Sequence, residues 1–281
     1  MFKTNHFAEL SASIPPSVMQ TFVIIMILLV AGGTLFDVIH KQSAKYFFRK
    51  GKKSEENAVR NVSGGEKVAL AVQTTVSDVL TSSEFCNPKR RIAHLLGMYG
   101  FVIYLIATIV MVFSYPTATE TTPAIWPMLW AIGALMVCVG GYWFWFFIRA
   151  DVSAEGQSPF RLVRADLFIL SLLASVTFGL IWAYLQSASG GAWTVIFLGL
   201  YLIATTVLFA GVPWSKFSHM FFKPAAAYQK KVAVANGALD GLPRVADRTN
   251  PEDSDRHSME LLKDAPLNMG LGIKREQPRH Y

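Results

Sequence analysis

Long apolar runs alternate with short polar segments along this chain. Five runs reach about 20 residues, the length that an α-helix needs to cross the hydrocarbon core of a bilayer. They lie at about 18–39, 92–114, 125–148, 166–187 and 193–213, each bounded by charge, proline or glycine. Because backbone groups in lipid must bond within their own segment, helices are the default spanning structure. The pattern therefore predicts an all-α integral membrane protein built as a five-helix bundle.

The first run is too long for the apolar region of a secretory signal peptide, and no A-x-A-like cleavage site follows it. We therefore expect it to remain as the first span. Only 16% of the residues are charged, against about 25% in soluble domains. This composition, with the five apolar runs, excludes a soluble enzyme.

Positive charge is concentrated in alternate loops. Segment 41–91 contains eleven Lys and Arg residues, segment 149–165 contains three, and four more begin the C-terminal tail. Loops 115–124 and 188–192 together contain one charged residue, Glu120. The positive-inside rule then predicts an outside N-terminus and a cytoplasmic C-terminus. The net charge of +7 arises mostly from this asymmetry, so it favours a lipid bilayer and not nucleic acid as partner.

These patterns divide the chain into four parts. Residues 1–40 form the outer N-terminus and first transmembrane helix, and 41–91 form a basic cytoplasmic segment. Residues 92–224 form a four-helix membrane core, and 225–281 a cytoplasmic tail that is solvated and partly disordered. Mild helical periodicity over 66–85 predicts a short surface helix. An apolar patch at 258–273 is either part of a loose end or a docking peptide.

The two cysteines, Cys86 and Cys138, limit the redox chemistry. There is no C-x-x-C-H motif, which excludes covalently attached c-type haem. Two thiolates also cannot hold a cysteine-only iron–sulfur cluster, which takes four. One cysteine is predicted to be cytoplasmic and the other mid-span, so we expect packing or surface residues without a disulfide.

The six histidines fall into two groups. His6, His257 and His280 lie in polar termini, and we expect no function for them. His40 closes the first span, three residues after Asp37 on the same helix face. This pair is either an interfacial cap, where the imidazole meets the helix dipole, or a proton relay for a quinone.

His94 and His219 lie at the same predicted membrane face. His94 begins the second span, and His219 follows the fifth. Haem iron accepts an imidazole on each side of the porphyrin, so two helices that each give one histidine can hold a haem b. His219 can reach the depth of His94 only if the fifth helix continues through Pro213.

The neighbours of His94 suit such a site. Gly97, one turn further on, leaves room for a flat macrocycle, with Gly100 beyond it. The cations at headgroup level could bind haem propionates; they are Arg90, Arg91, Lys216 and Lys223. Equally, the glycines could serve close helix packing, and the cations could be ordinary topology anchors.

Two strings resemble the cytochrome b membrane subunits of the nitrate reductase gamma-subunit type. They are "FCNPKRRIAHLLGMYGFVIY" at 85–104 and "PWSKFSHMFFKP" at 213–224. This family includes the membrane subunits of quinone-interacting oxidoreductase complexes, and the resemblance covers about 86–224. It implies a cytochrome b-like core with an outside N-terminus, and typically two stacked haems. His94 and His219 match the cytoplasmic ligand pair.

The second ligand pair of that family falls at Tyr104 and Tyr201. Neutral tyrosine is a poor substitute for histidine, so the resemblance implies at most one haem b, at the cytoplasmic side. Larger members also carry a cysteine-rich iron–sulfur domain, which this sequence with its two cysteines lacks. A short anchor of this kind is similar to the membrane proteins associated with dissimilatory adenylylsulfate reductase in sulfur bacteria. This resemblance implies a prokaryotic cytoplasmic (inner) membrane as the location.

The resemblance implies a subunit of an oxidoreductase complex that is not an enzyme alone. It would transfer electrons between a soluble cytoplasmic flavin and iron–sulfur enzyme and membrane quinone, with segment 41–91 and the tail as the docking surface. The alternative is a haem-free anchor that only tethers its partner. A small transporter is disfavoured, because no mid-membrane charge and no broken pair of spans is visible.

Overall fold

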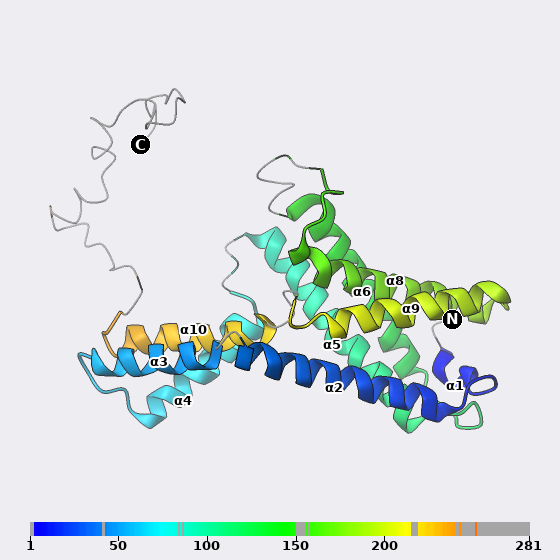
Figure 1. Ribbon diagram of the computed structural model, residues 1–281, viewed down its shortest axis with the longest axis horizontal. Coiled ribbons are helices and arrows are strands. Elements are labelled where there is room, and N and C mark those ends of the chain that lie inside the picture. The colour runs from blue at the N-terminus through cyan, green and yellow to red at the C-terminus, as the bar shows by residue number, and fades with distance from the viewer. Residues whose placement is uncertain are drawn as a thin grey trace.

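The computed structural model describes residues 3–40, 43–83, 85, 87–149, 156, 158–214, 219–239, 242 and 251. Within these ranges the regular elements are helices, without strands. Five segments are long and apolar enough to span a membrane, which confirms the five predicted spans. They are α2 (Pro16–His40), α5 (Pro88–Ser114), α6 with η2 (Ile125–Ile148), η3 with α8 (Arg164–Ser187) and α9 (Ala192–Ala210). Figure 1 shows these helices together as a bundle.

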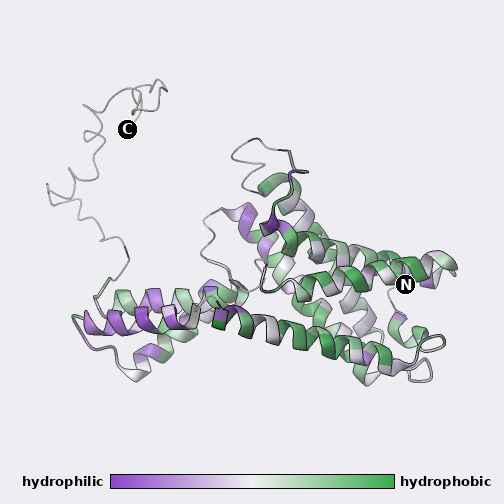
Figure 2. Ribbon diagram, in the orientation of Figure 1, coloured by the Kyte–Doolittle hydropathy of each residue, from purple (hydrophilic) through white to green (hydrophobic). Residues whose placement is uncertain are grey.

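The outer surface of the bundle is apolar. Large side chains such as Leu28, Ile39, Val195 and Phe147 are mostly exposed. The bundle helices are correspondingly green in the hydropathy view of Figure 2. Exposing that much apolar area to water would cost about 25 cal/mol per Å². These surfaces therefore face lipid, and the chain is a multi-pass membrane protein.

Helices α5 and α6 (Ile125–Trp143) pack backbone to backbone. A Cβ added at Gly100 would lie 2.7 Å from the carbonyl oxygen of Gly133, and one at Gly133 would lie 2.7 Å from that of Gly100. Only glycine permits this approach. Small residues at such positions are the usual means of close helix packing in membranes.

The N-terminal segment covers one end of the bundle. A short helix, α1 (His6–Leu10), is capped by Asn5, whose side chain accepts from the backbone N–H groups of Phe7 and Ala8. The Asn5 amide also donates to the carbonyl oxygen of Tyr115 (3.0 Å). The amide of Gln186 in α8 (Leu167–Ser187) donates to the His6 carbonyl oxygen (2.9 Å). These contacts tie α1 to the ends of α5 and α8.

A second helical unit lies at the other end of the bundle. It comprises α3 (Ser43–Glu56), α4 (Gly64–Gln73), the π-helix η1 (Thr74–Leu80) and α10 (His219–Ala235). Figure 1 shows α3 and α10 side by side beyond the ends of α2 and α9. We call residues 43–83 and 219–239 the basic unit. The helix predicted within 66–85 is present as α4 and η1, and is accompanied by two further helices.

Polar contacts hold the basic unit together. The Asn236 amide, just after α10, donates to both the backbone and side-chain oxygens of Ser54 in α3 (3.0 and 3.1 Å). The Gln229 amide donates to the Phe47 carbonyl oxygen (2.7 Å). Arg60 Nε donates to the carbonyl oxygen of Ala235 (2.6 Å). Helix α10 thus continues through residues that the sequence analysis assigned to a solvated tail.

The fifth span does not continue as a helix through Pro213. Helix α9 ends at Ala210, a turn follows at 211–214, and α10 begins at His219. Proline has no N–H to donate and disfavours a helical residue before it, which ends the helix here. The expected route for carrying His219 to the depth of His94 is therefore absent.

Candidate functional site

The His94 ring is exposed at the start of α5. Asn87 caps this helix by accepting from the N–H groups of Lys89 and Arg90, and Pro88 occupies its first turn. The ring's Nδ1 lies 3.1 Å from the Ser82 hydroxyl oxygen, and the ring centroid lies 4.9 Å from that of Phe85. With Nδ1 engaged in this way, Nε2 is the nitrogen that could bind a metal.

Ser82 is well fixed for orienting this ring. It is fully buried, and its backbone has a φ of +49°, a conformation uncommon for residues other than glycine. The N–H of Phe85 donates to the Ser82 carbonyl oxygen (3.2 Å), which closes a tight turn after η1. The serine and the phenylalanine that contact His94 thus come from one short turn.

Two more α5 side chains bind the same turn. Arg91 Nε donates to the carbonyl oxygen of Thr81 (2.7 Å), and the Tyr99 hydroxyl donates to that of Leu80 (2.7 Å). His94 therefore belongs to a set of three α5 residues that fasten η1 to the bundle. Arg90 lies elsewhere, with Nη2 3.5 Å from the carbonyl oxygen of Ile148.

The partner residues predicted for His94 are only partly described. His219 is the first residue of α10. The side chain of His219, and all of Lys216 and Cys86, lie outside the described residues. Cys138 is a free, half-buried cysteine in α6, 3.8 Å from the Thr177 hydroxyl.

The two glycines after His94 differ in environment. Gly100 forms the close contact with α6, as the packing interpretation expected. Gly97 has no described atom within 4 Å of a Cβ built on it. It lies one turn before Phe101, whose ring centroid is 6.4 Å from that of Phe209 in α9. Because residues four apart share a helix face, the open side of Gly97 is directed towards α9.

Tyr104 and Tyr201 meet in the centre of the bundle. The Tyr104 hydroxyl of α5 donates to the Tyr201 hydroxyl of α9 (3.0 Å), and both residues are buried. The Tyr201 ring stacks on Trp182 with 5.8 Å between centroids, and Tyr104 lies 5.2 Å from Trp130. A Cβ added at Gly179 of α8 would contact both tyrosines. This packing leaves no space for a macrocycle between the two tyrosine rings.

The candidate quinone pair, Asp37 and His40, has two different environments. Asp37 is buried, one turn after Gly33, where a Cβ would lie 3.1 Å from the Cβ of Val212. His40 is exposed, and its ring stacks on Phe36 with 5.2 Å between centroids and 9° between planes. The carboxylate therefore faces the connection after α9, whereas the imidazole faces outwards.

The environment of His6 was not predicted from the sequence, and the expectation that this residue has no function stays a prediction. This residue is buried, with its ring centroid 6.1 Å from Trp182 and 6.4 Å from Trp130. Its Nδ1 lies 3.4 Å from the Glu9 carboxylate. His257 and His280 lie outside the described residues. A histidine beside a helix-capping asparagine was the only signal in the sequence that could have indicated an ordered N-terminus.

A buried ion pair was also missed. Arg149, after η2, binds Asp166 at the start of α8 (2.8 Å) and donates to the carbonyl oxygen of Arg161 (2.6 Å). Its guanidinium carbon lies 4.0 Å from the Trp145 ring centroid. The sequence analysis counted Arg149 only as a topology charge. A buried pair of this kind fixes how the chain enters and leaves the loop between α6 and α8.

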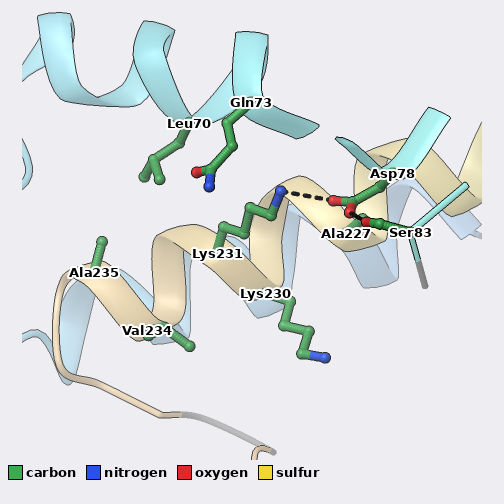
Figure 3. A pocket seen from close by; sticks show the side chains of 9 residues that line it. All are labelled: Leu70, Gln73, Asp78, Ser83, Ala227, Lys230, Lys231, Val234 and Ala235. Carbon is green, nitrogen blue, oxygen red and sulfur yellow. Dashed lines mark hydrogen bonds and ion pairs between the residues drawn. The ribbon is translucent and has the colours of Figure 1, made fainter. Parts of the chain in front are cut away.

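A groove of about 380 Å³ lies in the basic unit, between η1 and α10. Figure 3 shows the Lys231 ammonium directed at Asp78 across it, while Lys230 points away. Lys231 Nζ lies 2.7 Å from the Asp78 carboxylate and 3.0 Å from the Ser77 hydroxyl. The Ser83 hydroxyl donates to the same carboxylate (2.9 Å). The groove therefore has an internally satisfied ion pair as its polar centre.

The metal-ligating side chains are dispersed in the described part of the chain. No group of three or more His, Cys, Asp or Glu residues there is suited to hold a metal ion. A bis-histidine haem needs only two protein ligands, so this finding bears on zinc-like sites and not on haem. Comparison with known proteins gives no family model, no curated protein and no solved structure that matches the chain.

Proposed function

We propose that this protein is an electron-transfer membrane anchor that binds one haem b at the basic end of its bundle. The observation that carries the proposal is the environment of His94: an imidazole held at Nδ1 by a buried serine, one turn before a glycine whose open side faces α9. A hydrogen bond at the ring nitrogen that does not bind the metal is what usually orients a metal-binding histidine. The resemblance to cytochrome b subunits supplies His219 as the second ligand. Because α9 ends at Ala210, the connection between α9 and α10, and not a continuous fifth helix, would have to bring His219 to the level of His94.

The proposal assigns three tasks to the chain's residues. Nε2 of His94 would ligate the iron, and Gly97 would leave room beside it because it has no side chain. Arg90, Arg91 and Lys216 would supply the positive charge that propionates require. When bound, haem supplies one-electron transfer. The chain's own task is to hold the iron ligands, limit access of water and provide the charge for the propionates.

Only one haem level is supported. At the level where a second haem would lie, the Tyr104 and Tyr201 hydroxyls are 3.0 Å apart and enclosed by Trp130 and Trp182. The electron path then runs between the basic unit and quinone at the same membrane face. His40, exposed at the end of α2, is the group that exchanges a proton with quinone there, with the buried Asp37 one turn away.

The partner in this proposal is a soluble cytoplasmic flavin and iron–sulfur oxidoreductase, adenylylsulfate reductase by the sequence resemblance. The basic unit faces the cytoplasm of a prokaryotic cell under the positive-inside rule. Electrons pass between this enzyme and the quinone pool, and the anchor makes or breaks no bond alone.

The proposal is tested by the spectrum of the purified protein. We expect haem b bands in a reduced-minus-oxidised spectrum of the full chain in detergent. His94→Ala should lower haem occupancy by at least about tenfold. His40→Ala is the matched control, because it removes an exposed histidine at the same membrane face, and it should retain haem. A wild-type protein that folds without haem b bands overturns the proposal.

A haem-free tether is the second candidate, and one observation favours it. His94, Arg91 and Tyr99 together fasten the turn after η1, which gives His94 a purely structural role. In that case His94→Ala should loosen the basic unit yet leave quinone reduction by the assembled complex intact. Electron flow measured in membranes from the His94→Ala strain decides between the two candidates.

A further inference from the structure

A stripe of exposed valines runs along one face of α4 and η1. Val68, Val72 and Val76 are spaced four residues apart, so they are neighbours on one helix face. Their side chains are 64%, 57% and 51% exposed. We call these three residues the valine stripe. The opposite face of this helix carries Leu70, which lines the groove beside α10, and the buried Thr74.

The fold of the basic unit does not account for these valines. Branched side chains lose rotamer freedom in a helix, so Ala, Glu or Lys would favour α4 more at exposed positions. The face of α4 that packs within the basic unit is the opposite face, which carries Leu70. A cluster of exposed apolar side chains outside the bundle indicates a surface that another molecule covers.

The charge of the basic unit indicates what kind of molecule. Its described residues include ten Lys and Arg against four Asp and Glu. Every one of the four acids already has a cation within 4.0 Å: the pairs are Lys52–Glu56, Lys67–Glu55, Arg60–Glu66 and Lys231–Asp78. The charges of these described residues therefore sum to +6, and the Lys230 ammonium points away from Asp78 in Figure 3. Such a field attracts an acidic partner and speeds its encounter.

The placement of the stripe favours a protein over the bilayer. Helix α3, with 14 residues, extends about 21 Å past the end of α2. Helix α4 and η1 run back beside α10 to the turn that binds α5, so Val68 lies roughly 15 Å or more from that turn. A flat bilayer at the end of the bundle cannot contact the stripe along its length, whereas a soluble protein can.

We propose that the valine stripe is the apolar centre of a docking surface for an acidic soluble protein. This inference rests on the proposed function, in which the anchor has a soluble cytoplasmic redox partner, and assigns the contact to one helix face. Apolar contact at the stripe supplies affinity, and the surplus cations supply steering. Truncating or charging the centre should then weaken binding far more than changing other exposed residues of the unit.

Cysteine labelling in native membranes tests the stripe without assuming the partner's identity. Val72→Cys is compared with Val59→Cys, an equally placed control because Val59 is an 84% exposed valine of the same unit outside the stripe. Maleimide labelling is followed in broken membranes before and after a high-salt wash. The labelling of the chain without the added cysteine is subtracted as background. We expect Val72→Cys to label at least about tenfold more slowly before the wash, and Val59→Cys to label equally in both.

Each result has a defined meaning. Equal labelling of Val72→Cys before and after the wash overturns the inference. Protection that survives the wash also overturns it, because lipid, the chain's own tail or a second copy then covers the stripe. If purified adenylylsulfate reductase restores protection, both the inference and the proposed partner are supported. In the remaining outcome, protection is restored only by the peripheral fraction that the wash releases, and only while acidic proteins remain in that fraction. This result supports the valine stripe as a docking surface and contradicts adenylylsulfate reductase as the partner.

A binding measurement provides the second arm. Val72→Glu places a carboxylate at the centre of the surface. This change weakens binding of an acidic partner both through charge repulsion and through the loss of apolar contact. We expect affinity for whichever protein restored protection to fall by at least about thirtyfold, and Val59→Glu to stay within about threefold. Unchanged haem content in both variants shows that the core is intact. Equal affinities for the two variants contradict the inference.

Discussion

At the scale of single residues, the attachment of α10 to η1 depends on Lys231 and Asp78. Burial raises the pKa of the Asp78 carboxyl, but hydrogen bonds from Lys231, Ser83 and Ser77 together lower it further, so the pKa lies below its ordinary value. A carboxyl with a lowered folded-state pKa contributes stability above its unfolded pKa, about 4, and loses it as pH falls through the folded value. The contact should therefore weaken in acid.

This predicts an acid-sensitive step in unfolding. The thermal unfolding temperature of the wild-type protein in detergent should fall as the pH drops below about 4, the unfolded-state pKa of an aspartate. Asp78→Asn should be less stable at pH 7 and should lack this additional fall. Glu56→Gln is the control, because Glu56 forms only a long, exposed ion pair with Lys52. This variant should change neither the stability at pH 7 nor the fall of the unfolding temperature in acid. Identical pH profiles for wild type and Asp78→Asn would contradict the assignment.

Among single residues, the level of two tyrosines agrees with what the family resemblance implied. Tyr104 and Tyr201 were expected to occupy equivalent levels of two helices, and they hydrogen-bond to one another. The burial of His6 and the Arg149–Asp166 pair could not be foreseen. Each depends on how separate segments converge, and a polar residue near a loop or terminus has the same local signal whether it is buried or solvated.

At the scale of elements, α5 and α6 form the tightest contact of the bundle through Gly100 and Gly133. Gly100→Ala would bring a methyl carbon within 2.7 Å of a carbonyl oxygen, so the two backbones must separate. We expect a loss of about 1–3 kcal/mol or more in stability. Gly32→Ala is a matched control, because no atom of the described structure lies within 4 Å of its Cβ position.

The comparison is made by thermal or denaturant unfolding in detergent. Alanine favours a helix over glycine by about 0.8–1 kcal/mol, so Gly32→Ala should be neutral or slightly stabilising. Gly100→Ala should unfold at a clearly lower temperature. Equal stability of the two variants would mean that α5 and α6 tolerate a wider separation than their backbone contact indicates.

Element prediction succeeded where composition determines the element. Five runs of apolar residues became five long helices, because lipid permits little else at that length. The assembly of α3, α4 and α10 was not predictable. It depends on Asn236 and Gln229, whose amides reach backbone oxygens about 180 residues away in the sequence. The break after Ala210 had a visible signal in Pro213, which the analysis noted but did not take as the end of the helix.

At the scale of the whole molecule, charge asymmetry predicts which end of the bundle faces the cytoplasm. Fluorescent protein fused to the C-terminus should be bright, because it folds in the cytoplasm. Alkaline phosphatase inserted at Glu120, in the weakly charged loop 115–124, should be active, because it requires export. The opposite pattern of the two reporters would reverse the orientation, and with it the side on which a soluble partner could bind.

The buried tyrosine pair also has a bioenergetic consequence. With Tyr104 and Tyr201 hydrogen-bonded to one another across the bundle, no redox group fits between these two rings, where the second haem of the resembled family would lie. Under the proposed function, electrons and their compensating protons are then exchanged at a single face of the bilayer. Turnover would move no net charge across it, so this anchor would add to or draw from the quinone pool without itself generating a membrane potential.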